Sequence, residues 1–112
     1  MESNRQQKIN RLIQKELSEI FLQETKKMQG VFISVTNVRV SPDLGIAHAY
    51  LSIFPSERSE ELIANINGNV KSVRYELGKR VGKQLRVIPE LTFHLDDSLD
   101  YIENIDRLLK ND

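Results

Sequence analysis

The chain has 112 residues, 39% of them hydrophobic and 29% charged, and its sixteen basic residues balance sixteen acidic ones. This is the composition of an ordinary globular domain, long enough to bury a core without cross-links. The sequence has no cysteine, which excludes disulfides and thiolate-bound metals, and it shows no signal peptide or membrane-length apolar run. We therefore expect a single cytoplasmic domain over residues 1–112, away from membranes.

An amphipathic helix is predicted over residues 5–28, because apolar side chains recur at three- and four-residue steps without an interrupting Gly or Pro. Gly30 stands where such a helix should end. Residues 31–40 change to alternating β-branched positions, and a shift of parity near Asn37 indicates a bulge. This pattern predicts a first strand.

A turn is predicted at residues 41–45, Ser-Pro-Asp-Leu-Gly, in which Gly45 is expected to take positive φ. It leads into a second strand, residues 46–54, whose apolar side chains alternate with polar ones. The two strands should form an antiparallel hairpin with its apolar side against helices.

Residues 56–82 are predicted to be helical again, with Ser56 or Ser59 as the N-terminal cap. Three poor helix formers, Asn67, Gly68 and Asn69, stand in the middle of this stretch. On propensity alone they weaken a continuous helix by roughly 1–2 kcal/mol. We therefore predict two helices that meet at a kink.

A third strand is predicted at residues 85–95, in which Pro89 indicates a sheet edge or a bulge. A short terminal helix at about residues 98–110 should pack on a core of about residues 5–96. The order helix, strand, strand, helix, kink, helix, strand indicates an α+β domain: one three-stranded sheet with helices packed on one face.

Basic residues concentrate at residues 71–86, which hold six of them and a single acid, whereas residues 96–112 hold six acids and two bases. Such separation lets one face of a neutral protein meet a polyanion, although a solvated helix face would show similar charges. On a helical wheel, Lys71, Tyr75, Lys79 and Lys83 form a row opposite the apolar stripe. The candidate RNA-binding residues are Lys71, Arg74, Lys79, Arg80, Lys83 and Arg86, joined by Arg5, Lys8 and Arg11 if the first helix starts alongside.

Two candidates keep alternative interpretations. Tyr75 is placed to stack on an unpaired base, or to pack against the edge of the core. Arg39 is placed to meet RNA, or to pair with Asp43.

Two other classes of function are alternatives. An enzyme is disfavoured because His48 and His94 are expected to stand alone in their strands, isolated from each other and from any nucleophile or metal-ligand spacing, and no cofactor is expected. Asp96, Asp97 and Asp100 are better explained by a solvated turn and a helix cap than by a metal site. A protein adapter is the other class, in which the acidic end contacts basic partner proteins.

Four stretches resemble the ribosome-binding factor A family, whose fold is a type II, prokaryotic KH domain. They are QKINRLIQKELSEIFLQE, VTNVRVSPDLGIAHAYLSIF, VRYELGKR and LRVIPELTFHLDDSLDYIENIDRLL, and they cover nearly all of the chain. The resemblance implies a non-catalytic, cold-important assembly factor that binds the immature 30S subunit and its 16S rRNA. It further implies help with 5′-end processing of that RNA. In the adapter alternative, the resemblance implies basic ribosomal proteins or an assembly GTPase as partners of the acidic end. We expect a monomer.

The predicted kink departs from RNA-clamping KH domains, which carry Gly-x-x-Gly between the two helices. Family members commonly replace this loop by a kink of the Ala-x-Gly type, whose place falls on residues 69–71 here, Asn-Val-Lys. A clamp on single-stranded RNA at the kink is therefore doubtful.

Overall fold

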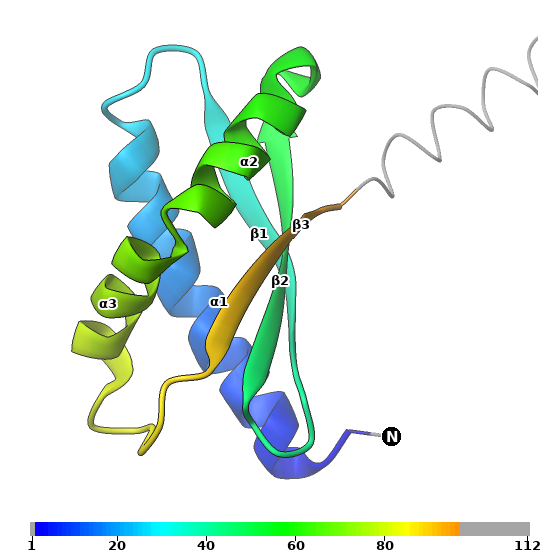
Figure 1. The fold of residues 1–112 in the computed structure, drawn as a ribbon, viewed down its shortest axis with the longest axis vertical. Coiled ribbons are helices and arrows are strands. Elements are labelled where there is room, and N and C mark those ends of the chain that lie inside the picture. Colours follow the sequence, from blue (N-terminus) through cyan, green and yellow to red (C-terminus); the bar gives the residue numbers. More distant parts are fainter. Residues whose placement is uncertain (1, 97–112) are drawn as a thin grey trace, which may run out of the picture.

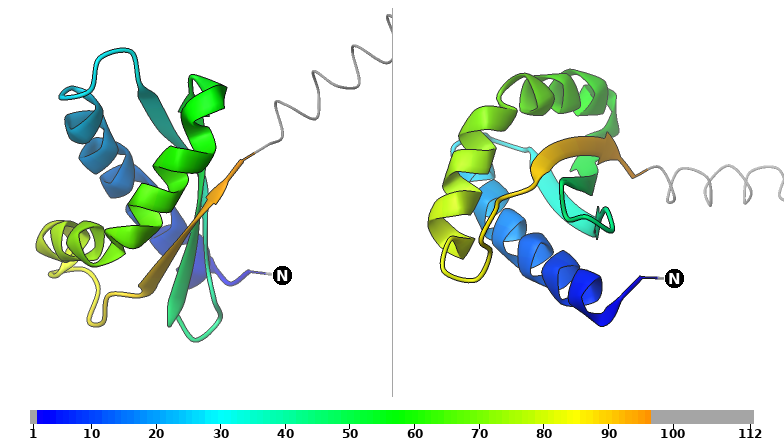
Figure 2. Two further views of the ribbon diagram at one scale, coloured as in Figure 1. Left: turned by 45° about the horizontal axis from the view of Figure 1, so that its top comes forward. Right: turned by 60° about the horizontal axis from the view of Figure 1, so that its bottom comes forward.

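The computed structural model describes residues 2–96, so the terminal helix predicted at about residues 98–110 lies outside the described part. Strand β2 is central in the sheet, antiparallel to β1 and parallel to β3. Figures 1 and 2 show the three α-helices gathered on one side of this sheet. The predicted α+β architecture is thereby confirmed. The elements are α1 (Asn4–Thr25), β1 (Phe32–Val40), β2 (Ile46–Phe54), the 3₁₀ turn η1 (Ser56–Arg58), α2 (Ser59–Gly68), α3 (Val70–Val81) and β3 (Glu90–Leu95).

Helix α1 begins with a capping box. The Ser3 hydroxyl accepts a hydrogen bond from the Gln6 amide at 3.1 Å, and the Gln6 side chain accepts one from the Ser3 amide at 2.9 Å. The helix ends at Thr25, three residues earlier than predicted. The chain turns before β1, and Gly30 takes a φ of +74°, a conformation that costs glycine little.

The core lies between the sheet and the helices. Val35, Val38 and Val40 of β1 point into it, and the register shifts between Val35 and Asn37, which confirms the predicted bulge. Phe21 and Phe93 meet edge to face across it, with ring centroids 5.6 Å apart. Its largest fully buried side chains include Ile13, Leu17, Leu51, Leu77 and Val81.

Side-chain amides of α1 cover the outer edge of β1. Gln6 donates to the Val40 carbonyl at 3.2 Å, and the Val40 amide donates to the Asn10 side chain at 2.8 Å. Gln14 donates to the Val35 carbonyl at 3.1 Å. These bonds occupy backbone groups that would otherwise be open to another strand. They also explain why Gln6 and Asn10 are buried although they are polar.

The opposite sheet edge, along β3, is covered by Asn67 and Arg74. The Asn67 side chain exchanges two hydrogen bonds, each of 3.1 Å, with the backbone N–H and C=O of Phe93. Arg74 donates to the carbonyls of Ile88 at 2.6 Å and Pro89 at 3.1 Å, just before the strand begins. Both edges of the sheet therefore rest on side chains from the helices.

Strand β3 is shorter than predicted. It begins at Glu90, and residues 82–89 form the connection from α3. Leu85 and Pro89 are buried, but Val87 between them is 71% exposed, so the alternation that favoured a strand there reflects two anchored side chains in a loop. The predicted cap is also wrong, because neither Ser56 nor Ser59 makes a side-chain cap bond. The Ser59 hydroxyl donates instead to the Ser56 carbonyl at 2.6 Å.

The β1–β2 turn differs from expectation at one residue, since Leu44 and not Gly45 takes positive φ (61°). At Gly45 a Cβ would lie 3.2 Å from Asp43 Oδ1, a tight contact that the Asp43 side chain would have to relieve by a small shift. That carboxylate accepts bonds from the Ser41 hydroxyl at 2.6 Å and the Gly45 amide at 3.0 Å. The two bonds, the Ser41 bond most, hold the pKa of Asp43 below its ordinary value.

Candidate nucleic-acid interface

The predicted kink lies between α2 and α3. Helix α2 ends at Gly68, helix α3 begins at Val70, and Asn69 between them has φ −113° and ψ 24°. The Asn69 amide donates to the carbonyls of Asn65 and Ile66, so it closes the end of α2. Beyond the kink, α3 runs next to α1 (Figure 1).

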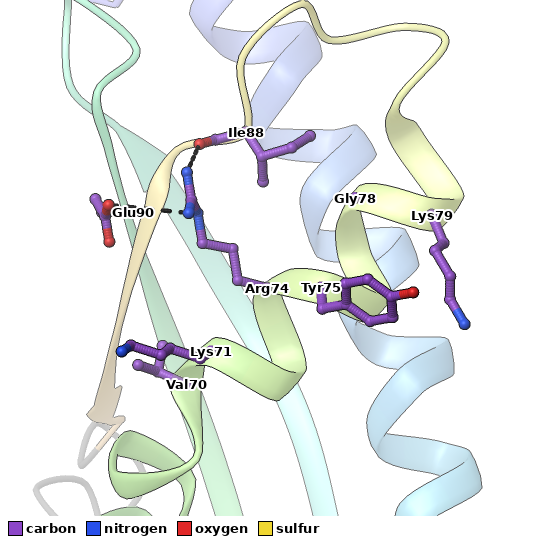
Figure 3. A pocket seen from close by; sticks show the side chains of 8 residues that line it. All are labelled: Val70, Lys71, Arg74, Tyr75, Gly78, Lys79, Ile88 and Glu90. Atoms are coloured by element: carbon purple, nitrogen blue, oxygen red, sulfur yellow. Dashed lines mark hydrogen bonds and ion pairs between the residues drawn. The ribbon is translucent and has the colours of Figure 1, made fainter.

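The exposed face of α3 carries Lys71, Tyr75 and Lys79, as the helical wheel predicted. The fourth residue of the predicted row, Lys83, lies beyond the end of the helix at Val81. Tyr75 is 67% exposed, so it does not pack against the core. The Lys79 ammonium lies 5.0 Å from the centre of the Tyr75 ring and 3.3 Å from a Glu76 carboxylate oxygen. Figure 3 shows the side chains of Lys71, Tyr75 and Lys79 along α3. The three residues line a hollow of about 620 Å³.

Arg74 and Arg80 of the same basic segment bind within the protein. Arg74 holds the start of β3 through the carbonyls of Ile88 and Pro89, and its guanidinium lies 4.0 Å from Glu90 (Figure 3). Arg80 turns to α1, where it donates to Glu19 at 2.8 Å and Glu16 at 3.3 Å. The wheel placed both arginines beside the apolar stripe, but their partners come from segments distant in sequence.

A second hollow, of about 730 Å³, lies between the start of α1, the β1–β2 turn and residues 84–89. Arg5, Lys8 and Arg86 line it, so the first turns of α1 do lie alongside the basic segment. Arg11 is exposed but does not line this hollow. Lys83 is exposed in the turn that leads from α3 to Arg86. We call Lys71, Lys79, Lys83, Arg86, Arg5 and Lys8 the cationic strip.

Most of the charge on the cationic strip is not neutralised by the described carboxylates. Within the described part of the chain, Lys79 is its only member with a carboxylate partner, and that pair with Glu76 is exposed. Exposed pairs of this kind contribute at most about 1 kcal/mol, so a phosphate can replace the carboxylate. Arginine grips phosphate with two donors and lysine acts as a point charge, so both residue types suit an RNA backbone.

The two histidines are not isolated, contrary to the interpretation from sequence. His48 Nδ1 and His94 Nε2 lie 3.0 Å apart on neighbouring strands, on the sheet face away from the helices. Over residues 2–96, no three His, Asp or Glu side chains gather in a way that could hold a metal ion. Asp97 and Asp100 lie outside this range. No helix in the same range is long and apolar enough to cross a bilayer.

Comparison of the sequence with known proteins identifies the family. The model of the ribosome-binding factor A family matches residues 5–109. This chain belongs to the ribosome-binding factor A family. Ribosome-binding factor A from Cytophaga hutchinsonii is 49% identical over 110 residues, which cover 97% of this chain and 83% of the relative. The resemblance drawn from the four sequence stretches is confirmed.

Solved ribosome-binding factor A structures share the fold. The crystal structure of the Thermus thermophilus protein matches with a TM-score of 0.67 and 21% identity, over 80% of this chain and 94% of that chain. A homology model of the Thermus thermophilus factor, fitted into a cryo-EM map of its complex with the 30S subunit, matches with a TM-score of 0.62 and 21% identity. That match covers 77% of this chain and 89% of the other. At this identity the likeness shows the fold alone.

Proposed function

We propose that this protein binds the precursor of the small (30S) ribosomal subunit in the cytoplasm, contacts its 16S rRNA and assists late maturation. The assistance includes 5′-end processing of the RNA, carried out without catalysis by this chain. Membership of the ribosome-binding factor A family over residues 5–109 supports the ribosomal target. The cationic strip is the observation on this molecule that carries the contact with RNA.

The cationic strip is suited to contact the phosphate backbone of a folded RNA, and less suited to recognise a specific base sequence. Its six side chains come from the start of α1, from α3 and from the α3–β3 connection. Lysines and arginines that contact phosphates fix position and orientation, and sequence is read elsewhere, at the base edges. We propose that Arg74 and Arg80, which bind protein groups, keep the strip in shape and do not hold RNA themselves. Arg11 we place beside the strip as an accessory contact.

Counterion release gives this proposal a measurable signature. Neutralising each phosphate changes the slope of log K against log salt by about −0.7 to −0.9. Six contacts therefore predict a slope between about −4 and −5.5 for binding to purified 30S precursors. A slope near zero would contradict the electrostatic account.

Charge reversal at Lys79 and Lys83 tests the location of the contact. The double variant Lys79→Glu/Lys83→Glu should weaken binding and bring the slope closer to zero by about 1.4 to 1.8. The matched control is Lys26→Glu/Lys27→Glu at the far end of α1. Lys27 pairs with Glu24 at 3.8 Å with the same i,i+3 spacing as Lys79 and Glu76, so both doubles bring a new glutamate next to an existing one. Equal effects of the two doubles would show that the strip is not the contact.

Maturation is tested in cells. Loss of the protein should lead to accumulation of 16S rRNA with an unprocessed 5′ end, most strongly in the cold, when misfolded RNA escapes slowly. The Lys79→Glu/Lys83→Glu variant should fail to correct this, and the control double should succeed. An adapter that works through ribosomal proteins or a GTPase would keep its partners in a nuclease-treated lysate, whereas the proposed RNA binder loses them.

A further inference from the structure

The sheet face opposite the helices is rich in rings. It carries both histidines of the chain, two of its four phenylalanines and one of its three tyrosines. The other two phenylalanines, Phe21 and Phe93, lie in the core. Short polar side chains stand between the rings, and the aliphatic Ile46 lies beyond them, where β2 leaves the turn. This composition differs from that of a face prepared for burial against another helix, which would be mainly aliphatic.

The rings form two groups along the strands. His94 lies in the middle of the first, with its ring centroid 5.2 Å from that of His48 and 5.2 Å from that of Tyr50. Tyr50 and His94 are stacked, at 28° between their planes. His48 meets His94 differently, because their rings are tilted by 33° and joined through the 3.0 Å contact between ring nitrogens. All three rings are partly exposed, so a flat ring can reach them from solvent.

The second group is the pair Phe32 and Phe54, each 65% exposed, with centroids 6.4 Å apart. Phe54 lies four residues beyond Tyr50 on β2, which is about 13 Å along an extended strand. Ser34 and Ser52 pair directly between the two groups. Because their side chains are small, they do not fill the space above the sheet between the two groups of rings.

Charge on this face is complementary to a nucleotide. Arg39 is exposed opposite His48 and has no ion pair with any carboxylate of residues 2–96, since Asp43 is held by Ser41 and Gly45. Two acidic side chains near this face contact other protein groups. Glu90 faces Arg74 at 4.0 Å, and Asp96 accepts from the Thr36 hydroxyl at 2.5 Å. Arg39 and His48 therefore occupy directly opposite positions on β1 and β2, which sets an exposed guanidinium in register with one of the rings.

We propose that this sheet face is a stacking platform for unpaired bases of single-stranded RNA, with Tyr50, His48, His94, Phe32 and Phe54 as the rings and Arg39 as the phosphate contact. Bases of any identity stack on aromatic side chains, and sheets that carry such rings bind two or three bases of a single strand. The platform rests on the proposed function, because the same ribosomal RNA supplies the strand. The β1–β2 turn, two residues beyond Arg39, also lines the hollow that holds Arg5 and Lys8, so the platform adjoins the cationic strip.

Nuclear magnetic resonance tests the platform directly, because the only two histidines of the chain both lie on it. A non-complementary RNA octanucleotide is titrated into the full-length protein while the histidine ring protons are observed. We expect both histidine signals to shift with the single strand. The same octanucleotide annealed to its complement should leave them in place, since its bases are paired and only its phosphates are offered.

Variants add a second measurement. Tyr50→Val keeps a good strand former and removes the ring, and it should raise the Kd for the octanucleotide about tenfold. Tyr50→Phe keeps the ring and should bind as the parent does. Phe32→Ser removes an exposed ring with little risk to folding, and it should also weaken single-strand binding severalfold.

Three results would overturn the platform. Histidine signals that stay unmoved while the octanucleotide binds would mean that bases dock elsewhere or that another part of the chain covers this face; the proposed function would stand. Equal shifts with the duplex would point to phosphate contact without stacking. Shifts that appear only with ribosomal proteins would make the face a protein-docking site. Failure of the proposed function is separate, because it would show as loss of the salt-dependent binding to 30S precursors.

Discussion

Replacing Arg80 by methionine should destabilise the fold and leave RNA contact almost unchanged, although Arg80 lies next to Lys79 in the basic segment. Arg80 joins α3 to α1, through bonds of 2.8 Å to Glu19 and 3.3 Å to Glu16. Its side chain is only 25% exposed, and that of Glu16 only 16%. Methionine preserves the apolar stem of arginine and deletes the charge.

The expected loss follows from the burial of the partners. Hydrogen bonds to charged groups contribute about 1.5–3 kcal/mol when buried, and exposed ion pairs contribute at most about 1 kcal/mol. The contribution of the Arg80 ion pairs should lie between these limits, because the Glu19 side chain is 49% exposed whereas that of Glu16 is only 16% exposed. We expect Arg80→Met to lower the free energy of unfolding by about 1–2 kcal/mol. For a domain of this size, that is a fall in Tm of roughly 5–15 °C.

Thermal unfolding followed by circular dichroism measures this loss, and binding to 30S precursors is then measured well below the lowered Tm. Lys79→Met is the control, since its exposed pair with Glu76 predicts a change under about 0.5 kcal/mol. The triple variant Arg80→Met/Glu16→Gln/Glu19→Gln should recover part of the loss, because it removes the carboxylates left without a partner. An Arg80→Met protein that melts like the parent but loses RNA binding as strongly as Lys79→Glu/Lys83→Glu would refute the assignment.

Other residues give further tests. Asn67→Ala removes two hydrogen bonds to the Phe93 backbone and should lower the free energy of unfolding, measured in urea, by about 1–3 kcal/mol. Asn65→Ala, at an exposed position of the same helix, should lower it far less. Equal losses would contradict the role of Asn67 in covering the sheet edge. Ser41→Ala removes the main cause of the lowered Asp43 pKa, so the carboxyl should titrate closer to its ordinary value of 3.8 by NMR. A lowered folded-state pKa stabilises the fold above the unfolded-state pKa, and this stabilisation is lost as pH falls through the folded-state pKa. In the variant the folded-state pKa is higher, so the stabilisation is smaller and disappears at a higher pH than in the parent during acidification. An unchanged titration would refute the role of the hydroxyl.

The elements of the fold were predictable because their signals are local. The parity change near Asn37 marks a bulge that the register of β1 and β2 confirms, and the poor helix formers at residues 67–69 mark the kink. The errors arose where a local pattern has a second cause. Residues 85–89 alternate like a strand, but only Leu85 and Pro89 are buried there, in a loop that closes over the core.

The side chains that cover the sheet edges escaped prediction because they look like solvated positions. Gln6, Asn10 and Gln14 lie on the margin of the apolar stripe of α1, and Asn67 stands among poor helix formers. Their partners are backbone groups 21 to 34 residues away. No spacing within one helix encodes such a pairing, so a sequence pattern alone cannot find it.

The same limit of sequence patterns applies to the basic segment, residues 71–86. Lys79 and Arg80 are adjacent and equal in charge, and only the neighbouring helix makes one of them an ion-pair partner of Glu16 and Glu19. The histidine pair depends on the parallel register of β2 and β3, which sets Tyr50 opposite His94. Periodicity within each strand does not contain this register, so the rings looked separate in the sequence.

The strip and the platform lie on different sides of the sheet, so one RNA segment that uses both must pass around the β1–β2 turn. The two contacts then respond to different variables. Phosphate contacts at Lys79 and Lys83 weaken steeply as salt rises, whereas stacking on Tyr50 depends on whether bases are unpaired and much less on salt. Binding that survives at high salt should therefore be lost in Tyr50→Val and kept in Lys79→Glu/Lys83→Glu. A residual affinity that is equally sensitive to both changes would mean that the two surfaces do not act as separate contacts.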